Sequence, residues 1–307
     1  MKGQRAPLNK SPNQSLEYKG LRPFRAPTWR LGSRPLPERI RPLVMGIVNL
    51  TPDSFYPDSR LPDPETAVTT ALRMVENGAD ILDLGAESSR PGSVPVGGPE
   101  EQRRLLPVLV VLRQQTDIAI TVDTTRVETA RLCLEAGADG INDVTAGTAE
   151  PNILNLAAEH DCGLVLMHMR GTPQTMQDDP QYDDVVAEIT TYLAQRAEAA
   201  EAVGVAAEKI IVDPGIGFGK TLAHNLALLA HLDELGGDRP LLLGASRKGF
   251  IGAVTGAAVE ERLPGSLAAL GAAFTAGVAV VRVHDVKASI QYLDILAAVA
   301  SAHRSSA

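Results

Sequence analysis

In this 307-residue sequence, the side chains that could bind or react with a ligand are concentrated in eight clusters of polar and glycine residues. Carboxylates, amides, imidazoles and cations recur in them, as in Asp213-Pro214-Gly215 and Arg282-Val283-His284. Each cluster directly follows a short apolar segment that is typical of a strand. For any single Asp after a strand, capping of the next helix is an alternative to ligand binding. The clusters lie at 49–55, 83–92, 123–125, 142–143, 168–171, 213–220, 244–248 and 282–285.

Alternating strands and helices must position these clusters. Apolar, β-branched segments predict strands near 43–48, 80–84, 118–122, 140–142, 164–167, 209–212, 241–243 and 279–283. Segments of helical period predict helices near 65–77, 99–115, 125–136, 151–160, 183–203, 221–235, 264–276 and 286–300. Eight of each predict an α/β fold, a single (β/α)8 TIM barrel, in which the carboxyl ends of all strands meet on one face and bring the clusters together. A doubly wound open sheet is the alternative, but 46–49 lacks the glycine-rich phosphate turn that such a sheet favours after its first strand.

The barrel domain is expected to occupy residues 42–307. Residues 1–41 contain ten Lys and Arg residues, two acidic residues and six prolines. This composition predicts a basic extension that is largely disordered and solvated, with a short hairpin near 28–41 around the turn signal Gly32-Ser33. A targeting segment is the alternative, but no amphipathic helical period supports it.

Composition argues against several classes of function. The sequence is 44% hydrophobic and 21% charged, which is typical of a globular protein. Its apolar runs are far shorter than the ~20 residues of a membrane-spanning helix. Cys133 and Cys162 support neither a disulfide framework nor a zinc site, and they fit a reducing cytoplasm. The net charge is −8 although the extension is basic, so the acidic body argues against nucleic acid as a partner.

Eight motifs together carry a resemblance to a known family. They are MGIVNLTPDSF, DLGAESSRPGS, VDTT, IND, LMHMRGTPQTMQ, DPGIGFGK, SRKGFIG and RVHDV. Over nearly the whole length from Leu43 to Asp285, the chain resembles the dihydropteroate synthases of folate biosynthesis. The resemblance implies a transferase that joins 6-hydroxymethyl-7,8-dihydropterin diphosphate to 4-aminobenzoate, giving 7,8-dihydropteroate and diphosphate. It also implies a sulfonamide target.

The resemblance places a pterin slot on the strand ends. A reduced pterin presents a guanidine-like edge that a carboxylate can grip with two parallel hydrogen bonds, and Asp213 matches that position. Asp123 and Asn142 would complete the slot, with Phe218 as a further pterin contact. Lys248 would donate to the ring carbonyl.

The leaving diphosphate needs positive charge and hydrogen-bond donors. Arg282 and His284 lie two apart on one strand, so their side chains share a face, and the resemblance adds Arg90 and Asn49 to the diphosphate site. Asn49 also matches the family's metal-associated position. With this one amide as a protein ligand, Mg²⁺ would be held largely by the diphosphate and water.

Long loops at 50–62 and 85–98 predict lids over the reacting centre. By resemblance, the lids would bring Asp58, Ser89, Arg90, Pro91 and Phe55 to the substrates, and the aminobenzoate site would be formed by Phe55, Ser89, Pro91, Ser246, Lys248 and Gly249. The catalytic residues would be Asp58, Arg90, Lys248 and Arg282. A cation at the exocyclic methylene is conjugated with the pterin, which favours bond cleavage before attack without a strong general base.

Two departures from many relatives concern the aminobenzoate site. Ser89 replaces a common Thr and keeps the hydroxyl, whereas Gly249 replaces a Ser found in some members. The aminobenzoate carboxylate would then depend on backbone N–H groups at the start of a helix and on Ser246, which leaves the affinity for sulfonamides open.

Two other functions stay open. A methyltetrahydrofolate methyltransferase would share the Asn, Asp and Asp-Pro-Gly elements but would not need Arg282 and His284 for a diphosphate. A non-catalytic pterin-binding paralogue would be expected to lack lid residues such as Asp58 or Arg90, and both are present. An apolar face of the last helix, formed by Ile290, Leu293, Leu296 and Val299, predicts a homodimer, as does the resemblance.

Overall fold

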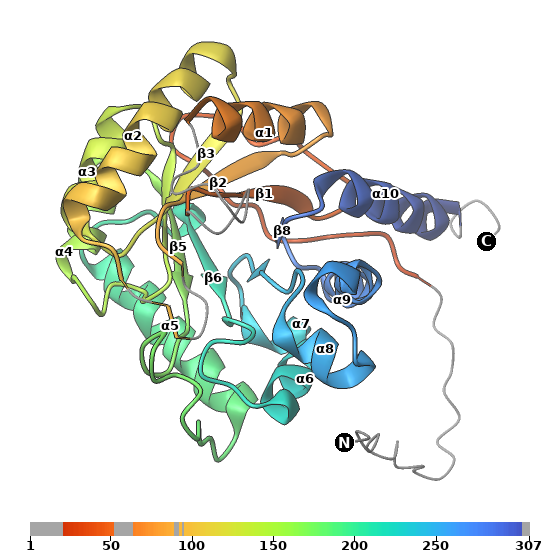
Figure 1. Cartoon of the computed structure of the whole chain (residues 1–307). Coiled ribbons are helices and arrows are strands. Elements are labelled where there is room, and N and C mark those ends of the chain that lie inside the picture. Colours follow the sequence, from red (N-terminus) through yellow and green to blue (C-terminus); the bar gives the residue numbers. More distant parts are fainter. Residues whose placement is uncertain (1–20, 52–63, 89–91, 94, 303–307) are drawn as a thin grey trace, which may run out of the picture.

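Eight parallel strands form a nearly closed barrel in the computed structural model, which describes residues 21–51, 64–88, 92–93 and 95–302 (Figure 1). The strand order β6-β5-β4-β3-β2-β1-β8-β7 pairs neighbours along the chain. Between β6 and β7 a bridge of Val212 with Leu241 completes the circle. The strands are β1 (Leu43–Asn49), β2 (Ile81–Gly85), β3 (Ala119–Asp123), β4 (Gly140–Asp143), β5 (Gly163–Met167), β6 (Ile210–Asp213), β7 (Leu242–Leu243) and β8 (Val280–Val283). The predicted (β/α)8 barrel is confirmed.

Helices surround the strands on the outside of the barrel (Figure 1). They are α1 (Pro64–Glu76), α2 (Gly98–Gln115), α3 (Val127–Glu135), α4 (Asn152–Glu159), α5 (Val185–Ala202), α6 (Leu222–Ala230), α7 (Leu232–Leu235), α8 (Gly249–Thr255), α9 (Leu263–Ala276) and α10 (Val286–Ala302). The prediction of a single helix over 221–235 is wrong, because His231 is not in the helical conformation and separates α6 from α7. The leucine period continues across His231, so the sequence pattern does not show the break. The short helix α8 was not among the eight expected.

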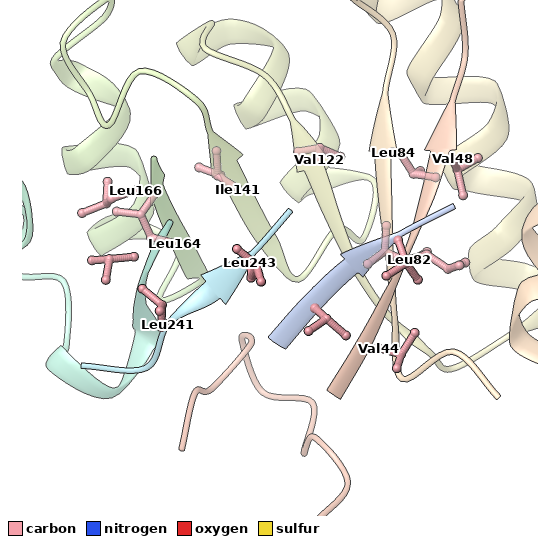
Figure 2. Packing of buried hydrophobic residues seen from close by; sticks show 14 of the residues in the cluster. Val44, Val48, Leu82, Leu84, Val122, Ile141, Leu164, Leu166, Leu241 and Leu243 are labelled. Atoms are coloured by element: carbon pink, nitrogen blue, oxygen red, sulfur yellow. The ribbon is translucent and has the colours of Figure 1, made fainter. Parts of the chain in front are cut away.

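Two apolar layers alternate along each strand. Val44, Val48, Leu82 and Leu84 belong to the layer between strands and helices (Figure 2). Met45, whose side chain points to the opposite face of β1 from Val44 and Val48, belongs to a second cluster with residues of β2, β3, β5, β6, β7 and β8. This period of two follows from the opposite directions of successive strand side chains. The second cluster consists of Trp29, Leu31, Met45, Ile81, Ala119, Val165, Ile211, Leu242, Ala279 and Val280.

The segment before β1 packs against the amino ends of the strands. Leu31 is fully buried, and a Cβ added at Gly140 or Gly163 would lie 2.5 or 2.3 Å from Leu31 Cδ2, so both strands begin with glycine to make room for it. The indole of Trp29 donates to the Lys209 carbonyl at 2.8 Å. Arg34 pairs with Asp139 at 2.8 Å.

The expectation of a solvated extension is therefore wrong for Trp29, Leu31 and Arg41, which are buried, whereas many other residues of 21–41 are exposed. The hairpin expected near 28–41 is reduced to one bridge, between Leu31 and Arg34. Arg41 is buried and pairs with Asp80 at 2.9 Å, which joins the segment to the start of β2. Residues 1–20 lie outside the described residues. Of the helices in the described part of the chain, none combines the length and the apolar character needed to cross a membrane.

Candidate active site

The strand register brings polar side chains together at the carboxyl face of the barrel. Asp123 of β3 lies beside Asn142 of β4, and Gly85 of β2 lies beside Asp123. Asp213 ends β6 on the same face, next to Met167 of β5. The strand-end clusters predicted from the sequence therefore converge, as a parallel barrel requires.

Arg282 lies at the centre of this face between two carboxylates. Its Nε donates to Asp83 at 2.6 Å and its Nη2 donates to Asp123 at 3.1 Å. Asp83 also accepts hydrogen bonds from Asn142 Nδ2 at 3.0 Å and from Thr121 Oγ1 at 2.5 Å. Burial raises the pKa of Asp123 to about 7, against the opposing effect of the Arg282 cation. Arg282 thus offsets the charge of the buried Asp83 and the partly buried Asp123 as well as offering charge to a ligand.

Asp213 and Lys248 are two further charged groups of the site, which influence each other's pKa without forming a direct ion pair. Asp213 is buried, and its Oδ1 accepts a hydrogen bond from the Gly215 backbone N–H at 2.7 Å. Burial raises the pKa of Asp213, and the Lys248 ammonium opposes that rise. Burial also lowers the pKa of Lys248 to about 8, although Asp213 favours its charged form. Lys248 Nζ donates to the Ile216 carbonyl and lies 4.4 Å from the centre of the Phe218 ring.

The loop after β6 is a tight turn that only glycine permits. Gly215 has φ +65°, and a Cβ there would lie 2.0 Å from the His168 carbonyl oxygen. Gly219 has φ +62°, and a Cβ there would lie 2.4 Å from the Arg170 carbonyl oxygen. These close approaches stack the loop on the end of β5. Phe218 and Asp213 are thereby held beside Lys248.

Buried contacts of Lys220 hold this loop against the end of β5. Lys220 is 2% exposed, and its Nζ contacts His168 Nδ1 at 3.0 Å and the Phe218 carbonyl at 2.8 Å. Burial lowers the pKa of Lys220 and lowers that of His168 to about 3. The His168 ring is therefore neutral, and its Nδ1 accepts from Lys220. Both residues stood in predicted clusters, but sequence reasoning assigned a role to neither.

The ends of β7 and β8 are joined by two side-chain contacts. The Ser246 hydroxyl lies 3.1 Å from His284 Nδ1 and accepts from the His284 backbone N–H at 3.3 Å. Arg247 has φ +55° and donates twice to Asp285, at 2.8 and 2.7 Å. The Ser246 hydroxyl is directed to His284, and its role in binding aminobenzoate stays a prediction. The contacts fix the neighbours Lys248 and His284 on the face of the barrel.

Gly249 begins α8 and is exposed. A Cβ added there would meet nothing within 4 Å, so the position has room for the Ser that some relatives carry. The role of Gly249 in binding aminobenzoate stays a prediction.

The predicted lids lie mostly outside the described residues, which exclude Phe55 and Asp58 in the first loop and Ser89, Arg90 and Pro91 in the second. The base of the second loop is fastened by Glu87, which accepts from Arg126 at 2.8 Å. Gly92 donates its backbone N–H to the Pro173 carbonyl at 2.9 Å, which joins this loop to the one after β5.

Asn49 ends β1 and is half-buried at the same face. Among the described residues there is no group of three or more His, Cys, Asp or Glu side chains that could hold a metal ion. The donor set fits a cation that takes one amide oxygen from the protein and its other ligands from a bound anion and water.

Sequence reasoning missed Thr121 and assigned no role to Asp83, although it placed Asp83 at the start of the cluster 83–92. Both lie inside strands and not at their ends. A buried polar residue inside a strand is easily taken as part of the apolar segment. An Asp inside such a segment is itself a signal, because a buried charge requires a partner.

Known proteins resemble this chain over most of its length. A family model described as "Pterin binding enzyme" matches residues 45–284. The chain is 46% identical over 253 residues to a dihydropteroate synthase of Synechocystis, covering 82% of this chain and 88% of that protein. It is similar to the solved dihydropteroate synthase of Xanthomonas albilineans with 4-aminobenzoic acid, with TM-score 0.78 and 45% identity over 84% of this chain and 93% of the other. It is also similar to the Burkholderia cenocepacia dihydropteroate synthase complexed with 7,8-dihydropteroate, with TM-score 0.83 and 41% identity over 92% and 99% of the two chains.

Proposed function

The chain belongs to the dihydropteroate synthase family of pterin-binding enzymes, and from this premise we propose that its carboxyl face joins a pterin diphosphate to 4-aminobenzoate. The products are 7,8-dihydropteroate and diphosphate. The observation that carries the proposal is the combination of Asp213 beside Lys248 with Arg282 between Asp83 and Asp123. Acceptors for a ring edge and cations for a diphosphate thus lie on one face.

The pterin is bound by its edges. Asp213 Oδ1 is held by Gly215, so the carboxylate has a fixed orientation toward the N3–H and 2-amino group of the ring. Lys248 donates to the ring carbonyl on the adjoining edge. The Phe218 ring lies beside Lys248 and covers the pterin, in the role that the resemblance implies.

The diphosphate is bound by the cationic side of the site. Arg282 contacts its two acids through Nε and Nη2, and its other N–H groups bind the anion. Ser246 holds His284 at the same end of β8. Preorganised donors of this kind stabilise the charge that develops on the leaving group. The bond between the exocyclic methylene and the diphosphate breaks before aminobenzoate attacks, because the cation left at the methylene is conjugated with the pterin. The aniline nitrogen of aminobenzoate is already neutral, so its attack needs no strong general base.

Magnesium is part of this proposal. Asn49 would supply its one protein ligand, and the diphosphate and water would supply the others. When bound, the cation would neutralise charge on the diphosphate. The proposal also places the enzyme in a reducing cytoplasm, supported by the free and buried cysteines Cys133 and Cys162.

The activity test distinguishes the synthase from the alternatives. With pterin diphosphate and 4-aminobenzoate, we expect diphosphate and dihydropteroate to appear in equal amounts, measured by a coupled diphosphate assay and by chromatography. EDTA should stop the reaction and excess Mg²⁺ should restore it. A methyltransferase or a non-catalytic paralogue would bind pterins without releasing diphosphate, and that outcome would refute the proposal.

We also propose a homodimer, through a different surface from the one the sequence suggested. Part of the last-helix face is used inside the chain, because Leu293 is fully buried and Ile290 packs against the core, whereas Val299 of the same face is 54% exposed. Over α6 and α8, which contact each other, apolar side chains are instead exposed. They are Leu222 (38% exposed) and Leu226 (44%) on α6 and Val254 (60%) on α8, together with Val259 (45%) shortly after α8.

Replacing Leu226 with Glu should separate the dimer, because a charge would be buried in the apolar interface. Light scattering after size exclusion should show the mass of one chain for Leu226→Glu and of two chains for the unmodified protein. Ile295→Glu is the matched control, since Ile295 is 66% exposed on α10 outside the proposed interface. A monomeric unmodified protein, or separation by Ile295→Glu alone, would contradict this interface.

A further inference from the structure

Asn225 is a buried amide of α6 that contacts the loop after β6 at two places. It is 4% exposed, and its Nδ2 donates to the carbonyls of Lys220 (3.3 Å) and Thr221 (2.8 Å). Its Oδ1 accepts from the backbone N–H of Gly217 at 2.7 Å. Because a carbonyl can only accept a hydrogen bond, these partners fix which end of the amide faces Gly217. The proposed function gives Asn225 no role.

The N–H group that Asn225 holds belongs to the peptide bond between Ile216 and Gly217. The carbonyl of the same peptide bond accepts a hydrogen bond from Lys248 Nζ. In a planar trans peptide the N–H and the C=O point in opposite directions, so an acceptor on one side orients the carbonyl on the other. Asn225 and Lys248 are thus connected through one rigid peptide group.

Gly217 makes the orientation of this peptide group dependent on its contacts. Its φ is +86°, and glycine restricts rotation of the backbone less than any other residue. A Cβ added to Gly217 would lie 3.4 Å from Lys248 Cδ, so the loop passes close to the stem of the lysine side chain. Gln177 holds the next peptide group, because its Nε2 donates to the Gly217 carbonyl at 2.8 Å. Asn225 holds the preceding one, on the side opposite to Lys248.

We propose that Asn225 is a positioning residue for Lys248, because it keeps the Ile216 carbonyl turned toward the lysine ammonium. This inference rests on the proposed function, in which Lys248 donates to the carbonyl of the pterin ring. An ammonium group has three N–H donors, so Lys248 can keep the Ile216 carbonyl and bind the ring at the same time. The Ile216 carbonyl then sets the direction in which the other donors meet the ligand.

The same contact favours the charged form of Lys248. Burial lowers the pKa of Lys248 to about 8, Asp213 opposes that change, and the Arg282 cation adds to it. Lys220 is a further cation nearby, and the charge of Lys248 lowers its pKa. An acceptor for the ammonium raises the pKa of a lysine. If the peptide group turns, Lys248 loses that acceptor and should release its proton at a lower pH.

Asn225→Leu and Asn225→Asp form a matched pair for the test, because all three side chains branch at Cγ. Leu removes the acceptor for the Gly217 N–H, whereas Asp keeps it. Anaerobic calorimetry should measure the affinity for 6-hydroxymethyl-7,8-dihydropterin across the pH range in which Lys248, with a pKa of about 8, loses its proton. The midpoint of the alkaline loss of affinity should move down by at least about half a pH unit in Asn225→Leu. It should not move down in Asn225→Asp.

The stability of the variants is controlled separately. Asn225→Asp should also lower the melting temperature, because its second oxygen faces the carbonyls of Lys220 and Thr221. Thr221→Ala removes the hydroxyl that accepts from the His224 N–H at 3.2 Å and caps α6, so it should lower the melting temperature without moving the midpoint. If Asn225→Leu does not fold, Asn225→Ala removes the same acceptor and should give the same downward shift.

A double-variant cycle tests whether Asn225 acts through Lys248. Each of Asn225→Leu and Lys248→Met should weaken binding of the dihydropterin when made alone. In the Lys248→Met background, Asn225→Leu should cause no further loss, because the ammonium that it positions is already absent. An equal loss with and without the ammonium would show that Asn225 acts on the slot by another route.

The outcomes also separate this inference from the proposed function. If the unmodified protein does not bind the dihydropterin, the proposed function fails. If the unmodified protein binds it without an alkaline loss, or if Asn225→Leu leaves the midpoint in place, the role of Asn225 is overturned while the function stands.

Discussion

Replacing Arg282 with Ala is expected to weaken binding of the unphosphorylated pterin as well as of the pterin diphosphate. A simple diphosphate-binding residue would affect only the second ligand. In the structure, however, Arg282 donates to Asp83 and Asp123, and both acids lie at the pterin slot. Removing one partner of a buried ion pair leaves an uncompensated charge and costs about 3–5 kcal/mol. That cost is one of folding stability. Because the unpaired acids should also lose their positions at the slot, we expect both ligands to bind at least about tenfold more weakly, with a larger loss for the diphosphate.

A matched variant shows whether the loss belongs to the site. Arg113 pairs with Asp139 at 2.6 Å on the opposite, amino-terminal side of the barrel. Arg113→Ala should lower the melting temperature and leave both affinities nearly unchanged in the same calorimetric titrations. Should Arg282→Ala bind the unphosphorylated pterin normally, its pairing with Asp83 and Asp123 would have no bearing on the slot.

The pairing of Arg282 also shows what the sequence could and could not predict. The barrel and its strand-end clusters were predictable, because apolar periods and connecting helices recur locally along the chain. The contact between Arg282 and Asp83 depends instead on register across β1, in which Met45 lies beside Arg282 and Ile47 beside Asp83. No local pattern encodes a side-chain contact between strands that are not neighbours.

A similar limit applies to Lys220 and to the segment before β1. Lys220 stood in a cluster predicted for the ligand face but had no predicted role, and the positive φ angles of Gly215 and Gly219 turn the loop so that Lys220 contacts the buried His168. The basic, proline-rich composition suggested solvation around Leu31. Its burial depends on the space left by Gly140 and Gly163, two residues far away in the sequence.

Asp213→Asn should reduce pterin affinity by roughly a hundredfold, since a charge-assisted pair of hydrogen bonds contributes up to ~3 kcal/mol. The Asn side chain keeps an oxygen for the Gly215 N–H, which Asp213 Oδ1 accepts at 2.7 Å. Its nitrogen then replaces Oδ2, so that a donor faces the donor edge of the ring. Calorimetry with the dihydropterin measures the loss. Asp143→Asn is the control, because Asp143 is buried but accepts from Thr145 and Gly147 in its own loop.

The pH dependence of pterin binding gives this prediction a second readout, which loss of shape alone would not produce. In the unmodified protein, affinity should fall as the pH rises through about 8, because Lys248, whose pKa burial lowers to about 8, loses its charge and a donor to the ring carbonyl. The Asp213 carboxylate favours the charged form of Lys248. Removing that negative charge should lower the pKa of Lys248 further, so the loss of affinity in Asp213→Asn should begin at a lower pH. Lys248→Met should abolish this alkaline loss altogether. If the alkaline loss occurs at the same pH in Asp213→Asn as in the unmodified protein, Lys248 and Asp213 do not act as a pair on the ligand.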